Sequence, residues 1–308
     1  MKNSIKLPKN FRIGHADYEG RTGVTAILCA EGTVGGVCVR GCAPGTRETD
    51  LLQSEKAISQ IDAVVLAGGS AFGLAVADGV MQHLASENRG VSVGAVKIPL
   101  VSSAVVFDIA SQTDIGKVDA KLGLQACKNA IENPTEWGSV GVGCGATVGK
   151  MLGTEFISKG GIGASTVGLG EMFVTAITVV NAVGDVYCHK TGKIIAGVRD
   201  KTGSFLDIKN LILSGALQAM MAVKGGATQG SNTTLSCVIT NAKLDKLHCN
   251  KLASIAHNGF AQSIKPVHTD YDGDTIFALS SGNMIFDFTA LGVMAVEAVS
   301  QSITEAVK

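Results

Sequence analysis

Short apolar runs bounded by glycine dominate the first quarter of the chain. Three of them, at residues 22–29, 34–41 and 62–67, are rich in Val, Ile and Ala, and each predicts a buried β-strand. Glu31 and Gly32 lie between the first two runs and can form a turn. We therefore expect the strands at 22–29 and 34–41 to pair as a hairpin.

A glycine-rich turn at residues 68–73 separates the third strand from a predicted helix. The helix starts from Ser70 as its N-cap and reaches about Leu84, because the apolar residues 74, 77, 81 and 84 share one face. A dinucleotide site requires G-x-G-x-x-G at such a turn, whereas this turn has the sequence G-G-S-A-F-G. We interpret it as a tight turn that packs a helix against a sheet or lines a pocket with backbone N–H groups.

The second half of the chain again alternates strands and helices. The strand at 173–181 is β-branched almost throughout and ends at Asn181. Beyond it the pattern predicts a strand, a helix, a strand and a helix, at residues 234–240, 245–262, 275–279 and 289–307. This order is typical of an α/β fold.

Composition narrows the class of protein. The 308 residues suffice for one large domain or two, and with 46% hydrophobic and only 17% charged residues we expect a homo-oligomer. Lys plus Arg equals Asp plus Glu at 26 each, so no net field attracts a nucleic acid or an anionic membrane, and we expect neither partner.

The cysteines and the first residues of the chain indicate the cellular compartment and whether a metal is expected. The eight cysteines include no C-x-x-C pair and have no matching His spacing, which favours small buried thiols in a reducing cytosol over a zinc site. No apolar run is typical of a signal peptide or a membrane span. We expect a cytoplasmic protein without a metal or a cofactor.

The middle of the chain, residues 138–170, is rich in glycine interleaved with Val, Ile and Thr. A flexible linker would lack those apolar residues, so this composition favours strands and loops that approach one another or a ligand closely. A phosphate-binding loop would need Ser or Thr after Gly149 and Lys150, where this chain has Met151.

Thr233 lies where a polar, glycine-rich segment at 224–232 meets a β-prone run. Threonine is a poor nucleophile unless a base is adjacent, and cleavage of the Asn232–Thr233 bond would free its own α-amine as that base. An exposed loop can be cut at such a place, but an ordinary Thr-rich strand start explains the same residues. Local sequence alone favours the ordinary strand.

Two further polar features allow two interpretations each. Asn181 at a strand end can donate to an oxyanion, or it can simply form a turn before Gly184. Asp272 and Asp274 would point to one side if the last strand has begun by Asp272, and such carboxylates can hold an ammonium, share a proton or bind a hard cation. The alternative is a solvated acidic turn.

Several long motifs, in order, resemble the L-aminopeptidase/D-esterase family, which includes β-aminopeptidases and nylon-oligomer hydrolases. The resemblance covers nearly the whole chain and rests on residues 13–15 with 23–25, 40–50, 66–74, 143–150, 180–185, 232–234 and 266–269 with 272–274. It implies a four-layer α-β-β-α sandwich of the N-terminal-nucleophile type, formed by residues 1–308 as a single domain. It also implies an autoprocessed precursor, cut into fragments 1–232 and 233–308 that stay associated.

Two departures place the chain near the nylon-oligomer branch. The prototype aminopeptidases carry Ser at the nucleophile position and Ser-x-Glu at the acidic site, whereas this chain has Thr233 after Asn232, and Asp272-Gly273-Asp274. Both departures argue against a plain L-aminopeptidase.

The resemblance implies a role for each matching residue. Thr233 would be the nucleophile in self-cleavage and in turnover, Asn181 would stabilise the oxyanion, and Lys150 would be a charge near the nucleophile. Asp272 and Asp274 would hold the Thr233 amine or the amino group of the substrate. The expected enzyme hydrolyses small peptides or ω- and β-amino acid amides as a tetramer of processed units. The alternatives are an acyltransferase of the ornithine-acetyltransferase type and a non-catalytic binding protein.

Overall fold

A computed structural model describes residues 5–109, 116–218 and 232–308 of the chain. The segment at 224–231, which precedes the expected cleavage bond, lies outside the described residues.

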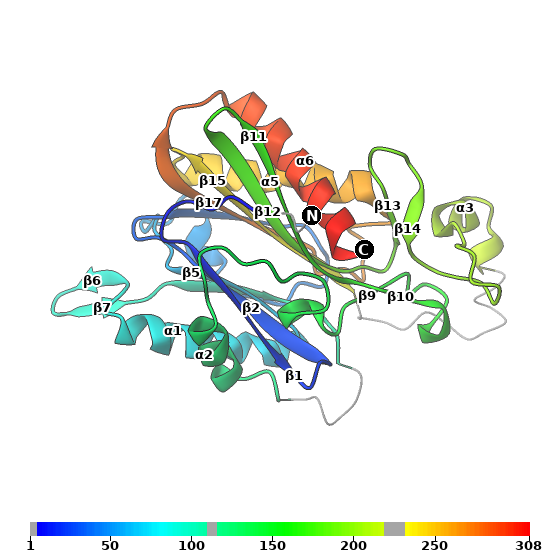
Figure 1. Cartoon of the computed structure of the whole chain (residues 1–308), viewed down its shortest axis with the longest axis horizontal. Helices are drawn as coiled ribbons and strands as arrows, with labels where there is room; N and C mark the ends of the chain where they lie inside the picture. Colours follow the sequence, from blue (N-terminus) through cyan, green and yellow to red (C-terminus); the bar gives the residue numbers. More distant parts are fainter. Residues whose placement is uncertain (1–4, 110–115, 219–231) are drawn as a thin grey trace.

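Two five-stranded sheets lie face to face, and each is covered on its outer face by a pair of helices (Figure 1). The first sheet has the order β1 (Arg12–Tyr18), β2 (Thr22–Leu28), β5 (Ala63–Ala67), β8 (Val101–Val105) and β4 (Thr46–Arg47). The second has the order β11 (Gly161–Leu169), β12 (Met172–Asn181), β15 (Thr233–Ala242), β17 (Thr275–Met284) and β3 (Val34–Val39). The helices are α1 (Val76–Ser86) and α2 (Ala120–Lys128) on the first sheet, and α5 (Lys246–Ser263) and α6 (Phe288–Ala306) on the second.

Smaller elements surround this frame. They are the hairpin of β6 (Val91–Val93) and β7 (Val96–Ile98), the pair β9 (Thr147–Val148) and β10 (Ser158–Lys159), the sheet of β13 (Asp185–Tyr187), β14 (Ile194–Ala196) and β16 (Ile264–Lys265), and the helix α3 (Ile208–Leu213). No helix among the described residues combines the length and the apolar character that a membrane span requires.

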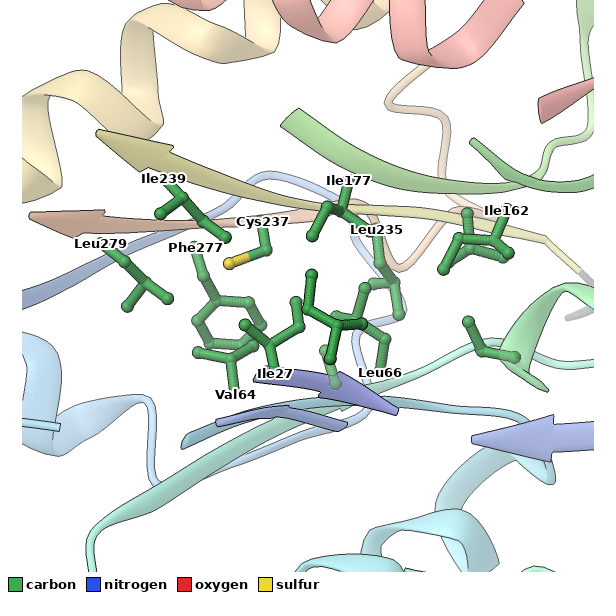
Figure 2. Packing of buried hydrophobic residues seen from close by; sticks show 14 of the residues in the cluster. Ile27, Val64, Leu66, Ile162, Ile177, Leu235, Cys237, Ile239, Phe277 and Leu279 are labelled. Atoms are coloured by element: carbon green, nitrogen blue, oxygen red, sulfur yellow. The ribbon is translucent and has the colours of Figure 1, made fainter. Parts of the chain in front are cut away.

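Three hydrophobic clusters fill the spaces between the four layers. The central cluster lies between the sheets, where Ile27 and Leu66 face Leu235 and Phe277 (Figure 2). A second cluster joins the second sheet to α5 and α6, and a third joins the first sheet to α1 and α2. Because both faces of its sheet are covered, every residue of β12 is buried, and this explains its almost unbroken apolar sequence. The expected α-β-β-α sandwich is confirmed.

Most of the predicted strands and helices form close to their expected bounds. The runs at 173–181 and 234–240 become β12 and β15, and the periodic segments 245–262 and 289–307 become α5 and α6. Each of these helices begins after an aspartate whose side chain accepts a backbone N–H, Asp245 for α5 and Asp287 for α6.

The predicted hairpin of residues 22–29 and 34–41 is wrong. The two strands form as β2 and β3, but β2 pairs with β1 and β5 in the first sheet, whereas β3 pairs with β17 in the second. The short connection therefore crosses between the sheets. A Cβ on Gly36 would lie 2.4 Å from the backbone nitrogen of Asn250, so glycine lets β3 pack directly beneath α5.

The expected N-cap at Ser70 is also wrong. Gly69 precedes the helical turn, Ser70 has a left-handed backbone with φ of 53°, and no side chain caps the helix there. The chain first forms a 3₁₀ turn over Ser70–Ala75, and α1 follows from Val76. The turn takes this shape while bringing Gly69 N–H to the carboxylate of Asp108, at 2.7 Å.

Candidate active site

Thr233 is the first residue of β15, and it lies directly opposite Asn181, the last residue of β12. The side chain is buried, and its hydroxyl donates a hydrogen bond to the carbonyl oxygen of Asn232, the residue before it. The hydroxyl oxygen is thus next to the carbonyl group that it would attack in self-cleavage.

Gly273 lies beside the Asn232 carbonyl group and contacts its oxygen. Its backbone N–H donates to the Asn232 oxygen at 3.2 Å. A Cβ at position 273 would lie 2.8 Å from the Thr233 hydroxyl oxygen and 2.8 Å from the carbonyl oxygen of Ala43. Only glycine leaves room for the hydroxyl here, and the N–H is placed to stabilise negative charge on the Asn232 oxygen.

Asn181 is fully buried, and neighbouring residues fix the orientation of its amide. The side-chain oxygen accepts from the Lys150 ammonium at 2.6 Å and from the Thr147 backbone N–H at 3.0 Å. The side-chain nitrogen donates to the carbonyl oxygen of Phe107 at 2.9 Å. Because Lys150 holds the amide oxygen on one side, the amide nitrogen lies on the other side, where it donates to Phe107.

Lys150 is buried beside this amide and also donates to the main-chain oxygen of Asn181 at 3.1 Å. Burial lowers the pKa of its ammonium to about 7, although the carboxylates of Asp108 and Asp272 favour the charged form. The structure thus places Lys150 beside Asn181. The hydrogen bonds from its ammonium to both oxygens of Asn181 orient the amide.

Asp272 and Asp274 are both buried, but β17 begins only at Thr275. The expectation that a strand pleat points both carboxylates to one side is therefore wrong, and a turn brings them together. The backbone of residues 40–43 holds this turn, because Arg40 N–H donates to Asp274 O and Ala43 N–H to Asp272 O, both at 2.9 Å. Burial and the nearby Asp274 raise the pKa of Asp272 to about 6.

Three residues of this cluster were not singled out in the sequence. Phe107 contributes a carbonyl group, and Asp108 a carboxyl group whose pKa burial raises to about 6. His268 contacts Asp274 through its ring Nδ1 at 2.8 Å. Phe107 and Asp108 follow β8 without a recognisable motif, whereas the proximity of His268 to the two aspartates in the sequence could have suggested a contact.

The sequence of this chain is similar to those of known peptidases and amide hydrolases. The model of peptidase family S58 matches residues 5–308, which is nearly the whole chain. The chain belongs to peptidase family S58. An uncharacterized aminopeptidase of Mycobacterium tuberculosis is 40% identical over 291 residues, which cover 91% of this chain and 82% of the relative. A 6-aminohexanoate-oligomer endohydrolase of Paenarthrobacter ureafaciens is 31% identical over 313 residues, which cover 96% and 83%.

Two solved structures have the same fold. A β-aminopeptidase of a Burkholderia species superposes with a TM-score of 0.68 at 20% identity, over 97% of this chain and 84% of that one. The L-aminopeptidase D-Ala-esterase/amidase of Ochrobactrum anthropi, described as a variant of the Ntn hydrolase fold, gives 0.66 at 16% identity over the same shares. The expected family and fold are thereby confirmed, and the chain is placed among hydrolases of the aminopeptidase and amidase type.

Proposed function

We propose that this member of family S58 is an autoprocessing amidohydrolase with an N-terminal threonine nucleophile. It cleaves its own Asn232–Thr233 bond and then hydrolyses small amides through a Thr233 acyl-enzyme. The observation that carries the proposal is the contact of the Thr233 hydroxyl with the Asn232 carbonyl oxygen, inside a buried cluster of Asn181, Asp272 and Asp274.

Self-cleavage would proceed in two steps. First, the Thr233 oxygen attacks the carbonyl carbon of Asn232, the C–N bond breaks, and the nitrogen gains the hydroxyl proton to become the new α-amine, which leaves an ester between Asn232 and the Thr233 oxygen. Water then hydrolyses the ester and releases the Asn232 carboxylate and the free Thr233 hydroxyl. The N–H of Gly273, 3.2 Å from the Asn232 oxygen, supports this route because it can stabilise the negative charge that develops there.

Turnover would use the same hydroxyl with the freed amine as its base. An α-amine has a reference pKa of about 7.7 to 8.0, so a useful fraction is neutral near pH 7. The amine takes the hydroxyl proton as Thr233 attacks the substrate amide, and returns it to the leaving amine. Asn181 would stabilise the oxyanion, with its amide held in place by Lys150.

Substrates with a free amino group near the scissile amide fit this site best. Asp272 and Asp274 place two buried carboxyl groups beside the nucleophile, and a carboxylate pair can hold an ammonium group. The names of the relatives agree, because they include an endohydrolase of 6-aminohexanoate oligomers and a β-aminopeptidase. We propose small peptides and ω- or β-amino acid amides as the substrate class.

We also propose that the protein is a cytoplasmic homo-oligomer, a tetramer of processed units, in which residues 1–232 and 233–308 remain one domain. Exposed apolar side chains on the outer helices and loops support association, with Val293 of α6 at 66% exposure and Ile285 at 90%. Light scattering coupled to size exclusion would measure the mass of the particle directly.

The test is turnover of 6-aminohexanoyl p-nitroanilide by the wild-type chain and by Thr233→Ala. We expect release of nitroaniline and 6-aminohexanoate by wild type only, and a transient acyl-enzyme on the fragment that starts at Thr233. A competing amine added to the assay separates hydrolysis from acyl transfer. Transfer to the amine as the main outcome would contradict the hydrolase, and a wild-type chain without any turnover would favour a binding protein.

A further inference from the structure

The carboxyl group of Asp274 accepts three N–H donors. The backbone N–H of Thr234 lies 2.7 Å from one oxygen, and the backbone N–H and ring Nδ1 of His268 lie 3.1 Å and 2.8 Å from the other. A backbone N–H can only donate, so both oxygens of Asp274 act as acceptors. In the tautomer with a hydrogen on Nδ1 of His268, all three contacts donate to the carboxylate form of Asp274.

Asp272 has a different set of contacts. The backbone N–H and the hydroxyl of Thr269 both lie on Oδ2, at 2.8 Å and 2.7 Å. A proton can therefore reside on Oδ1 while both contacts are kept. Burial and the charge of Asp274 favour the protonated form of Asp272, and the contacts of Asp272 leave Oδ1 for that proton.

The ring of His268 is held from both sides. The residue has a left-handed backbone with φ of 56°, which directs its N–H and its ring to the same oxygen of Asp274. On the other side the ring packs against His257 of α5, with centroids 4.9 Å apart, and against Phe260. His257 points Nε2 at the carbonyl oxygen of Cys38 at 2.9 Å, and burial lowers its pKa to about 4, so this neighbour is neutral.

We propose that His268 is a positioning residue that keeps Asp274 as the permanent anion of the carboxylate pair, so that Asp272 is the member that gains and loses a proton during the Thr233 chemistry. The inference rests on the proposed function. In acylation the hydroxyl proton of Thr233 moves to the α-amine, and the charged Asp274 holds the resulting ammonium. Asp272 in its ionised form can take a proton from that ammonium and return it before the α-amine protonates the leaving amine.

Other charged or titratable groups face the pair from each neighbouring element. These are His257 of α5, Lys150 after β9, Asp108 after β8 through its effect on Lys150, and Arg40 after β3. The guanidinium of Arg40 donates to Ser254. The ring of His268 contacts the carboxylate of Asp274 directly, at 2.8 Å.

Two substitutions at position 268 separate the ring donor from the backbone. Asn and Gly both tolerate a left-handed backbone, but only the Asn side chain can replace the Nδ1–H donor. The measurement is the pH profile of kcat with 6-aminohexanoyl p-nitroanilide. We expect the acid limb of the profile, where kcat falls as pH decreases, to lie about one pH unit higher for His268→Gly. At pH values below this limb kcat should be about tenfold lower than in wild type, because a hydrogen bond to a charged group is lost. His268→Asn should keep the wild-type limb.

If the acid limbs of both variants lie at the same pH as that of wild type, the inference is overturned, since the ring donor would then have no effect on Asp272 and Asp274. Equal shifts in both would also overturn it, because ring packing rather than the donor would be responsible.

A second measurement needs no turnover and separates the inference from the proposed function. Urea unfolding of both variants in the uncut Thr233→Ala chain should show His268→Gly less stable than His268→Asn at pH 7, with a smaller gap at pH 4, where carboxylates become protonated. An equal gap at both values would contradict the inference even if the wild-type chain proves inactive.

Discussion

In the first sheet, β5 begins at Ala63, which pairs with Leu28 at the end of β2; in the second, β15 begins at Thr233, which pairs with Asn181 at the end of β12. The two sheets share one plan, because in each the neighbouring pairs are antiparallel, antiparallel, parallel and antiparallel. In each, the parallel pair is joined through a helix, α1 or α5 (Figure 1). The equivalent strand-end pair is therefore apolar and buried in the first sheet, Ala63 with Leu28, and polar and buried in the second, Thr233 with Asn181.

The turns beside these positions also correspond. In the first sheet, Asp62 precedes the strand and its carboxylate accepts the backbone N–H of Leu100. In the second, Asn232 precedes the strand and its carbonyl oxygen accepts the N–H of Gly273. The order and direction of the strands determine where the two strand ends meet in each sheet. The proposed reaction needs polar side chains at that place in the second sheet, and burying them costs free energy.

The largest expected effect comes from Asn181→Asp. The carboxylate keeps an acceptor for Lys150 but loses the N–H donors, so the oxyanion has no side-chain partner. We expect kcat to fall by about 10²- to 10³-fold. Leu28→Met, at the corresponding position of the first sheet, is the control and should leave kcat unchanged. A variant with near-wild-type kcat would show that the oxyanion donor lies elsewhere.

The next largest effect is expected from Gly273→Ala. The added Cβ would meet the Thr233 hydroxyl oxygen at 2.8 Å and displace either the nucleophile or the turn. Self-cleavage, followed by intact mass over time, should slow by about 10- to 100-fold. This corresponds to an activation free energy that is higher by about 1.4 to 3 kcal/mol, because the nucleophile is misplaced. The control is Gly168→Ala in β11, where the new Cβ has only an ordinary contact at 3.5 Å. Equal cleavage rates in the two variants would contradict this role of Gly273.

A smaller effect is expected from Lys150→Met, which keeps the length of the side chain and removes its donors. The Asn181 oxygen then loses a charge-assisted partner at 2.6 Å, so the amide is less well oriented. We expect a roughly tenfold lower kcat with little change in KM, because such a bond contributes on the order of 1.5 kcal/mol. A change confined to KM would indicate that Lys150 binds the substrate instead.

The smallest effect concerns stability and pH. Burial raises the pKa of Asp272 to about 6, above its unfolded value near 3.8, so the folded chain holds the proton more tightly and its stability falls as pH rises from about 4 to 6. Asp272→Asn in the Thr233→Ala background should therefore raise the free energy of unfolding at pH 7 by on the order of 1 kcal/mol, and less at pH 4. Urea titrations at both pH values measure this free energy. An Asp272→Asn variant that is less stable than its parent at pH 7 would contradict the claim that the buried charge of Asp272 destabilises the fold.

Sequence patterns predicted the scaffold well where burial alone decides structure. The segments that became β12, β15, α5 and α6 are continuous or periodic apolar runs, and these appear directly in the sequence. The hairpin of 22–29 and 34–41 failed because a short turn has the same sequence signals whether its strands pair or cross between sheets. The packing of Gly36 beneath α5, which decides the case, is a contact between distant segments.

The site was predictable only in part. Thr233, Asn181 and the aspartates emerged from motifs shared with a family, whereas their local sequences favoured ordinary strand and turn residues. The contact of His268 with Asp274 depends on a left-handed backbone at 268 and on support from α5, neither of which the pattern of residues predicts.

The most direct test of the central claim is the intact mass of the purified wild-type chain beside Thr233→Ala and Leu28→Met. We predict that wild type and Leu28→Met separate under denaturing conditions into two fragments, 1–232 and 233–308, with Thr233 as the first residue of the smaller one, and that Thr233→Ala stays whole. A wild-type chain that remains intact, or a Thr233→Ala chain cut at the same bond, would contradict the proposal that Thr233 cleaves its own precursor.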